Sequence, residues 1–223
     1  MINFRFHKIN YLILGSMFGI FANIIRICGD LIAILLYPGY NLTIHMISFL
    51  GSSPGHKFFT FGLILSAILI IPFYLSIVTV FKNEFPEKEK LIHRSLQVLI
   101  ISAISLSLVG FFLELSNIIL NPLIYDLHGF FAVIAFSCAV FSCVVMGILI
   151  QKSIYFPQFF AYMCYIVAGV NLIFLFTWHA LLEWLSSSLV IILQLSLGVY
   201  LICKKLKYKQ DLIEYRRNFI KKW

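Results

Sequence analysis

The stretch FFTFGLILSAILIIPFYLSIVTVF, residues 58–81, contains 24 consecutive residues without a charged side chain. A helix of that length spans about 36 Å at 1.5 Å per residue, which is enough to cross a hydrocarbon core of about 30 Å. The charged segment KNEFPEKEK, residues 82–90, follows directly. This part of the chain therefore predicts a membrane-spanning helix that ends in water.

Five further apolar runs repeat this pattern along the chain. Helices are required because backbone amides that face lipid must pair within their own segment. The whole sequence of 223 residues is 61% hydrophobic and 12% charged, whereas soluble domains carry about 25% charged residues. We predict an all-α integral membrane protein, a six-transmembrane-helix bundle with spans at residues 11–36, 58–81, 96–115, 130–150, 159–176 and 185–203. Pro72 is expected to kink the second span without ending it.

Lysine and arginine are distributed unevenly between the two predicted sides of the bundle. Fifteen of the 17 lie in the N-terminal segment, the second and fourth loops and the C-terminal tail. Of the other two, Lys57 lies on the opposite side and Arg26 lies within the first span. Because cytoplasmic segments of membrane proteins are rich in these residues, we predict that both termini are cytoplasmic. The chain then forms three helical hairpins whose connections face outward, and we expect it in the cell membrane.

The basic C-terminal segment, residues 204–223, is predicted to be separate from the transmembrane domain, residues 1–203. On a helix its apolar side chains fall on one stripe beside lysine and arginine, namely Tyr208, Leu212, Tyr215, Phe219 and Trp223. This pattern is typical of an amphipathic helix that lies on an anionic lipid surface. The alternative is that the stripe docks in a groove of a protein partner. Nucleic-acid binding is not expected, because the chain lacks a soluble basic face.

Small residues recur every four positions in the fourth span, at Ala135, Ala139, Cys143 and Gly147. A strip of this kind predicts that a neighbouring helix approaches closely. A second interpretation is that the polar groups among such residues line a functional cavity. Both interpretations are open at the level of sequence.

Arg26 and Asp30 are four residues apart in the first span. An ionisable residue within the bilayer is by default a hypothesis for a functional site. A mutual ion pair that faces the bundle would make both residues tolerable there. The alternative is that Arg26 pairs with Glu114 across the bundle. A structural role and a role in substrate binding are both open.

Histidines and carboxylates gather on the predicted outer side. His179 and Glu183 lie one helical turn apart, and Asp126 and His128 flank the entry to the fourth span. Together with His45, they supply the ligand types of a catalytic zinc site or an acid–base pair. We predict that these five residues are candidates for catalysis, although the sequence specifies neither a metal nor another cofactor. The competing interpretation is that such histidines are ordinary residues of the headgroup region.

The first outer loop carries a family resemblance. It contains the motif residues Pro38, Gly39 and Tyr40, followed by Ile47, Ser48, Leu50, Gly51 and Pro54. This pattern resembles the "PGY … IS-x-LG … P" loop of a prokaryotic membrane-protein family known as domain of unknown function 998. The resemblance extends over residues 11–203, where Glu114, His128 and the stretch 181–183 are similar to that family's acid after the third span, its following histidine and its "GLLER" stretch. The residues between Asn41 and Leu50 are expected to form an interfacial helix.

Two residues depart from the family pattern, which usually has an acid at the position of Phe49 and an arginine at that of Trp184. A similar loop occurs in a eukaryotic membrane family that includes lipid-remodelling proteins for GPI anchors and modulators of autophagy. That likeness implies a function involving membrane lipids. We therefore expect a lipid-interacting or partner-binding membrane module. The alternatives are an enzyme that hydrolyses or remodels outer-leaflet lipids and a transporter of small solutes, which needs a polar path from Arg26 to the cytoplasmic side.

Overall fold

The structure, a computed structural model, describes residues 2–119 and 122–220, and the side-chain contacts of residues 11–119 and 123–205. Its described part is built from six long helices: α1 (Ile2–Leu35), α2 (His56–Glu84), α3 (Glu89–Ile119), α4 (Pro122–Lys152), α5 (Gln158–Thr177) and α6 (Ala180–Ile220). Two short 3-10 helices, η1 (Ile47–Ser52) and η2 (Pro86–Lys88), lie in the connections. Each helix is longer than its predicted span, because polar residues extend it beyond the apolar run.

All six helices are long and apolar enough to cross a membrane. Large apolar side chains are exposed around the outside of the bundle, as with Phe21 at 56% and Phe61 at 65%. Such a surface is stable in lipid but not in water. Pro72 lies inside α2, which continues through it. The chain is therefore an all-α multi-pass membrane protein, and the predicted fold class is confirmed.

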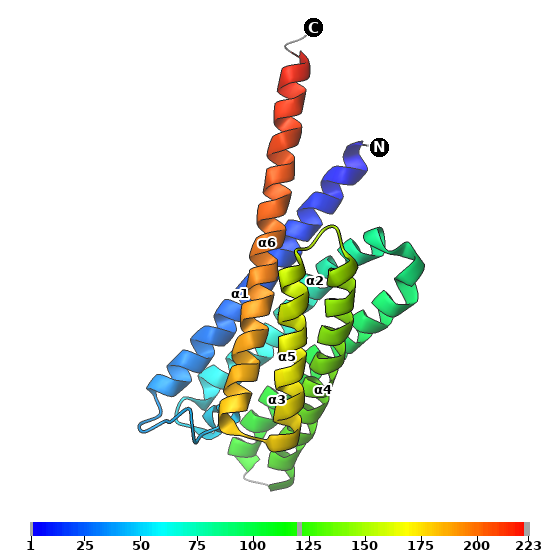
Figure 1. Ribbon diagram of the computed structural model, residues 1–223. Helices are drawn as coiled ribbons and strands as arrows, with labels where there is room; N and C mark the ends of the chain where they lie inside the picture. Colours follow the sequence, from blue (N-terminus) through cyan, green and yellow to red (C-terminus); the bar gives the residue numbers. More distant parts are fainter. Residues whose placement is uncertain (1, 120–121, 221–223) are drawn as a thin grey trace.

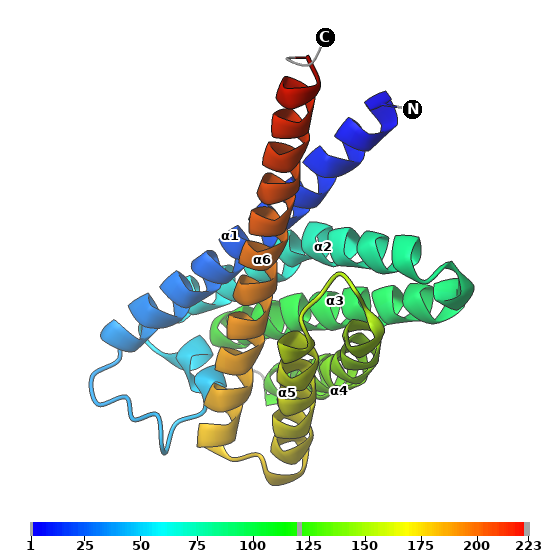
Figure 2. The same ribbon diagram turned by 45° about the horizontal axis from the view of Figure 1, so that its top comes forward.

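The helices form a closed ring. Each helix packs against the next one along the chain, and α6 returns to pack against α1 (Figure 1). The start of α1 and the end of α6 lie at the same end of the bundle, and Figure 2 shows them together from a second direction. We call this the basic end. The opposite end carries the α1–α2, α3–α4 and α5–α6 connections, and we call it the histidine end because His45, His56, His128 and His179 lie there.

The first loop is not the interfacial helix expected for residues 41–50. Turns occupy most of its first half, and a 3-10 helix follows at Ile47–Ser52. The loop folds inward because Ile47 and Leu50 are buried against α2 and α3. Tyr40 connects the loop to α6, because its hydroxyl oxygen accepts a hydrogen bond from Trp184 Nε1 at 2.9 Å. The same hydroxyl donates to the carbonyl oxygen of Met46 at 2.9 Å. Burial raises the pKa of Tyr40 well above its usual value, so this hydroxyl keeps its proton.

The helix α6 continues without a break from the bundle to Ile220 and extends past the other helices at the basic end (Figure 2). No change of secondary structure marks the predicted boundary at residue 204. The stripe from Tyr208 to Trp223 depends on side chains outside the described residues. Its contact with a lipid surface or a partner therefore stays a prediction.

Glycines allow α1 and α2 to approach each other closely. A Cβ atom at Gly29 in α1 would lie 2.7 Å from the backbone oxygen of Phe58 and 3.2 Å from the Cα atom of Gly62, both in α2. Backbone atoms cannot rotate aside as a flexible side chain can, so the helices would have to separate. This is the packing that small residues permit between helices in membranes.

Gly29→Ala is expected to lower the free energy of unfolding by about 1–3 kcal/mol, the usual cost of overpacking. Gly169→Ala is the matched control, because no atom lies within 4 Å of a Cβ built at Gly169 in α5. That control should be neutral or stabilise slightly, since alanine favours helix over glycine. Thermal unfolding of the two purified variants in the same detergent measures the difference, and equal midpoints would contradict the close approach.

Candidate ligand-binding cavity

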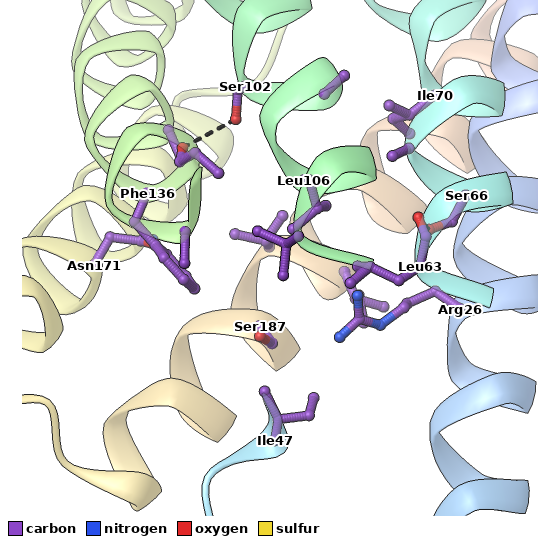
Figure 3. Close-up of a pocket in the computed structure, with 18 of the residues that line it drawn as sticks. Arg26, Ile47, Leu63, Ser66, Ile70, Ser102, Leu106, Phe136, Asn171 and Ser187 are labelled. Atoms are coloured by element: carbon purple, nitrogen blue, oxygen red, sulfur yellow. Dashed lines mark hydrogen bonds between the residues drawn. The ribbon is translucent and has the colours of Figure 1, made fainter. Parts of the chain in front are cut away.

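The ring of helices encloses a cavity of about 450 Å³ (Figure 3). All six helices and the first loop contribute to its lining. A cavity of this volume falls within the range of binding sites for small molecules, about 300–1,000 Å³.

The cavity runs along the bundle and differs at its two ends. On α2 its lining extends from Phe59 to Ile77, which is about 27 Å of helix. Toward the basic end its wall consists of almost fully buried side chains such as Ile77 and Leu197. At the histidine end Phe49 and Trp178 line it and are also exposed at the surface, by 43% and 42%. The cavity is therefore closed toward the basic end and opens at the histidine end.

Most polar side chains in the wall already have partners within the protein. Ser102 Oγ donates to the backbone oxygen of Ala135 at 3.0 Å (Figure 3), and Asn23 Nδ2 donates to that of Gly19 at 2.8 Å. Gln194 Nε2 likewise donates to the Tyr74 hydroxyl at 3.0 Å. Because these groups are occupied, the deep wall presents mainly hydrocarbon to a ligand. This disfavours the polar path that a transporter of small solutes would need.

Arg26 places a positively charged side chain in the cavity wall. Its Nε donates to Oδ2 of Asp30 at 2.9 Å, and the two residues are only 9% and 6% exposed. The guanidinium lies over the ring of Phe59, 5.0 Å from the ring centre, and reaches into the cavity (Figure 3). Arg26 thus pairs within its own helix, whereas Glu114, the alternative partner, pairs elsewhere.

Glu183 lines the same end of the cavity and is 6% exposed. Its carboxylate faces the backbone N–H groups of Ile47 and Ser48 and the Ser48 hydroxyl. Its Oε2 atom is buried without a hydrogen-bond partner. The carboxyl group therefore holds the start of η1 against α6, and it lies near Arg26.

The other predicted catalytic residues do not assemble around one point. Asp126 and His128 line the cavity, and His128 Nδ1 contacts the carbonyl oxygen of Tyr125. The ring of His45 instead packs against Tyr37, and His179 is exposed. Within the described part of the chain, no three His, Cys, Asp or Glu side chains are placed to hold a metal ion. The three-histidine zinc arrangement is therefore not formed, and the catalytic roles of these residues stay predictions.

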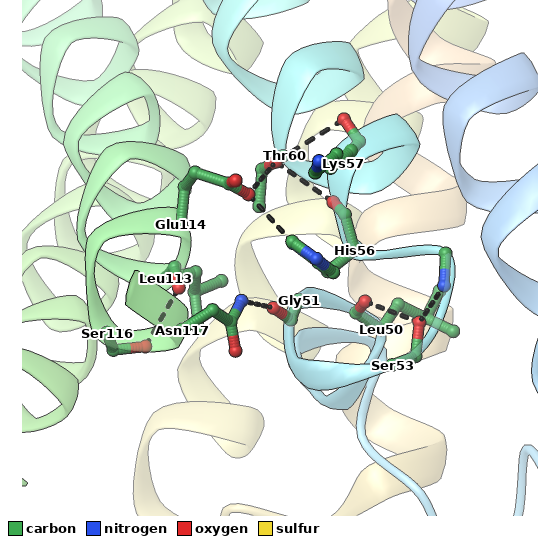
Figure 4. A network of polar contacts seen from close by, with 11 residues as sticks. Leu50, Gly51, Ser53, His56, Lys57, Thr60, Leu113, Glu114, Ser116 and Asn117 are labelled. Carbon is green, nitrogen blue, oxygen red and sulfur yellow. Dashed lines mark hydrogen bonds and ion pairs between the residues drawn. The ribbon is translucent and has the colours of Figure 1, made fainter. Parts of the chain in front are cut away.

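A polar network that the sequence did not predict joins α2 to α3 outside the cavity (Figure 4). Oε2 of Glu114 accepts hydrogen bonds from His56 Nδ1 at 2.9 Å and from the Thr60 hydroxyl at 3.0 Å. One turn further on, Asn117 Nδ2 donates to the backbone oxygen of Gly51 at 2.6 Å. The family-like acid at position 114 therefore joins α3 to α2, and Asn117 joins α3 to the first loop.

The strip of small residues in α4 packs against α5 at Gly147 and lines the cavity at its other three positions. Gly147 accommodates the ring of Tyr165 in α5, since a Cβ there would lie 2.5 Å from that ring. Ala135, Ala139 and Cys143 instead line the cavity. Their small size leaves the space that the cavity occupies.

The fold and the cavity define a class: a multi-pass membrane protein with six helices around a blind, largely apolar site. The chain matches the family described as "Protein of unknown function (DUF998)" over residues 20–200 and belongs to that family. The family resemblance seen in the first loop is thereby confirmed. No curated protein and no solved structure matches the chain. The likeness to the eukaryotic lipid-remodelling family stays a prediction.

Proposed function

We propose that this protein binds a membrane lipid in the cavity, with the polar part of the lipid at the histidine end and its hydrocarbon along the apolar wall. The observation that carries this proposal is the uneven polarity of the site. Arg26 and Glu183 line the histidine end, whereas buried apolar side chains such as Ile77 and Leu197 close the other end. An amphiphile has the same division between one polar end and one apolar end.

The physics of an apolar cavity in a membrane supports an occupant. Lipid tails are as apolar as leucine, so a hydrocarbon chain gains no hydrophobic energy by leaving the bilayer for the cavity. An empty cavity, however, forfeits the dispersion contacts of every side chain that lines it. A chain that fills the space restores these contacts, and polar contacts at the open end then select the lipid.

Ala139→Phe is expected to displace the lipid, because residue 139 lines the cavity and a phenyl ring would occupy the space of the ligand. Val144→Phe on the same helix is the matched control, since Val144 is 39% exposed on the bundle surface. Both variants and the unmodified protein are purified in detergent, and the lipid retained per protein is measured by native mass spectrometry. Loss of lipid from the Ala139 variant alone supports the proposal.

Equal amounts of retained lipid in the Ala139 variant and the unmodified protein would overturn the proposal, as would a complete lack of lipid on the unmodified protein. The same samples bear on the predicted alternative, a lipid hydrolase. Asp126, His128 and Glu183 line the cavity, so a reacting lipid would occupy the same site. Accumulation of a lipid with a cleaved chain in the presence of the unmodified protein would support that alternative.

We also propose that the basic end faces the cytoplasm and that the protein resides in the cell membrane. The last turns of α2 and α4 carry Lys82 and Lys152 at this end, and η2 carries Lys88, in line with the usual excess of cations inside. The basic tail would then lie near anionic lipids or reach a protein partner. A reporter fused after the last residue should be active only in the cytoplasm.

A further inference from the structure

The protein uses only part of the hydrogen-bonding capacity of the Arg26 guanidinium. The guanidinium carries five N–H groups in a planar fork, and Nε is used by Asp30 at 2.9 Å. Among the described residues, its other N–H groups have no hydrogen-bond partner, although Arg26 is only 9% exposed. Figure 3 shows the fork reaching into the cavity. A buried donor without a partner costs free energy. Acceptor atoms of a bound ligand would therefore stabilise this side chain.

From this arrangement we infer that the lipid is a single-chain amphiphile with a monoanionic oxygen head group, held by the N–H groups of Arg26 that face the cavity. The shared chemistry is that of a fatty-acid carboxylate or the phosphodiester of a lysophospholipid. The inference rests on the proposed lipid binding and names the class of lipid.

The head group follows from the geometry and charge around Arg26. A guanidinium binds carboxylate and phosphate oxygens in pairs, and the ring of Phe59, 5.0 Å away, supports one face of the fork. Two carboxylates, Asp30 and Glu183, lie close by. Because both carboxylates repel negative charge, a dianionic head group would meet more repulsion than a monoanionic one. A monoanion keeps the paired hydrogen bonds with Arg26 at the smaller cost.

The single chain follows from the shape of the cavity. Between Arg26 and the basic end, its lining on α2 extends from Leu63 to Ile77, about 21 Å of helix. This exceeds the depth of one leaflet, about half of a hydrocarbon core of about 30 Å. The whole cavity, about 450 Å³ along about 27 Å of α2, is narrow. Two chains side by side would need a wider space, so one chain runs from Arg26 toward the closed end.

The test compares four lipids on the full-length protein in a neutral detergent. Oleate and oleoyl-lysophosphatidylglycerol have one chain and a monoanionic head, monooleoylglycerol has one chain and no charge, and dioleoylphosphatidylglycerol has two chains. Each competes with a dansyl-labelled fatty acid, and native mass spectrometry gives the number bound. We expect one anionic single-chain lipid per protein, bound about tenfold or more tightly than monooleoylglycerol, as befits hydrogen bonds to a charged group.

The decisive variant is Arg26→Met combined with Asp30→Leu, because replacing both members of a buried ion pair by apolar residues preserves the fold better than removing one. This variant should still bind monooleoylglycerol but lose the preference for an anionic head. Arg94→Met is the matched control, since Arg94 is exposed on α3 and lies outside the cavity. It removes the same charge and should keep the preference.

The outcomes separate the two proposals. Tighter binding of oleate or of the lysophospholipid supports the inference in either case and identifies the source of the oxygen head group. Equal binding of monooleoylglycerol, a preference that survives the double variant, or equal binding of the two-chain lipid overturns the inference while lipid binding stands. Absence of saturable binding of the labelled fatty acid and of all four lipids overturns the proposed function itself.

Discussion

Asp30→Asn is expected to lower the free energy of unfolding by about 3–5 kcal/mol, the cost of removing one partner from a buried ion pair. Asp30 accepts from Arg26 Nε at 2.9 Å, and both residues are buried within the bundle. Asparagine has nearly the same shape but no charge. The guanidinium would then remain in an apolar setting without its nearest counter-charge, and the more distant Glu183 would compensate only in part.

The matched comparison is the double variant Arg26→Met and Asp30→Leu, which removes both charges. It is expected to unfold close to the unmodified protein, because apolar replacements of a buried pair are often neutral or stabilising. Unfolding in mixed micelles with increasing SDS, followed by circular dichroism, measures all three proteins. Stability of Asp30→Asn equal to that of the unmodified protein, or a double variant as unstable as the single one, would contradict this account of the pair.

The six helices could be predicted because each depends on a property of its own segment. A run of apolar residues long enough to cross the bilayer has few alternatives to a helix, so neighbouring segments need not be known. The same holds for Arg26 and Asp30, since a separation of four residues places two side chains on one face of a helix. The six helices are confirmed, and the hydrogen bond between Arg26 and Asp30 matches the predicted pair.

Contacts between distant segments could not be predicted in this way. His56 and Glu114 lie 58 residues apart in sequence, and nothing in the local pattern of either residue identifies the other. The cavity depends likewise on small residues such as Ala67, Ala103 and Ala139, which belong to three different helices. The sequence alone does not distinguish an alanine that leaves a space from an alanine that admits a neighbouring helix.

The first loop shows how packing overrides a local expectation. The residues between Asn41 and Leu50 have enough apolar character for an interfacial helix, but Ile47 and Leu50 can reach the gap between α2 and α3. Burying them there favours a compact 3-10 turn over a helix on the surface. The ring of His45 takes part in this packing, with its centre 5.6 Å from that of Tyr37.

The two departures from the family pattern have structural uses in this chain. Trp184, where the family usually has an arginine, donates from Nε1 to the Tyr40 hydroxyl at 2.9 Å and so ties α6 to the loop. Phe49, where an acid is usual, lines the opening of the cavity.

At the other end of the bundle, Phe81→Ala is expected to lower the free energy of unfolding by about 3 kcal/mol, near the lower limit for truncating a buried phenylalanine. Phe81 is 0% exposed, and its ring centre lies 5.4 Å from that of Phe156 and 6.5 Å from that of Phe85. In a membrane the unfolded helix already lies in lipid, so the transfer energy largely disappears. The lost dispersion contacts account for the remaining effect.

Phe61→Ala on the same helix separates packing from hydrophobicity, because Phe61 is 65% exposed to lipid and loses the same atoms. Its effect should stay within about 0.5 kcal/mol, as for most surface substitutions. The two variants are compared by unfolding in mixed micelles. Because Phe81 lies outside the lining of the cavity, the folded fraction of its variant should bind oleate as the unmodified protein does. Equal losses of stability at positions 61 and 81 would show that α2 is not held by its inward face.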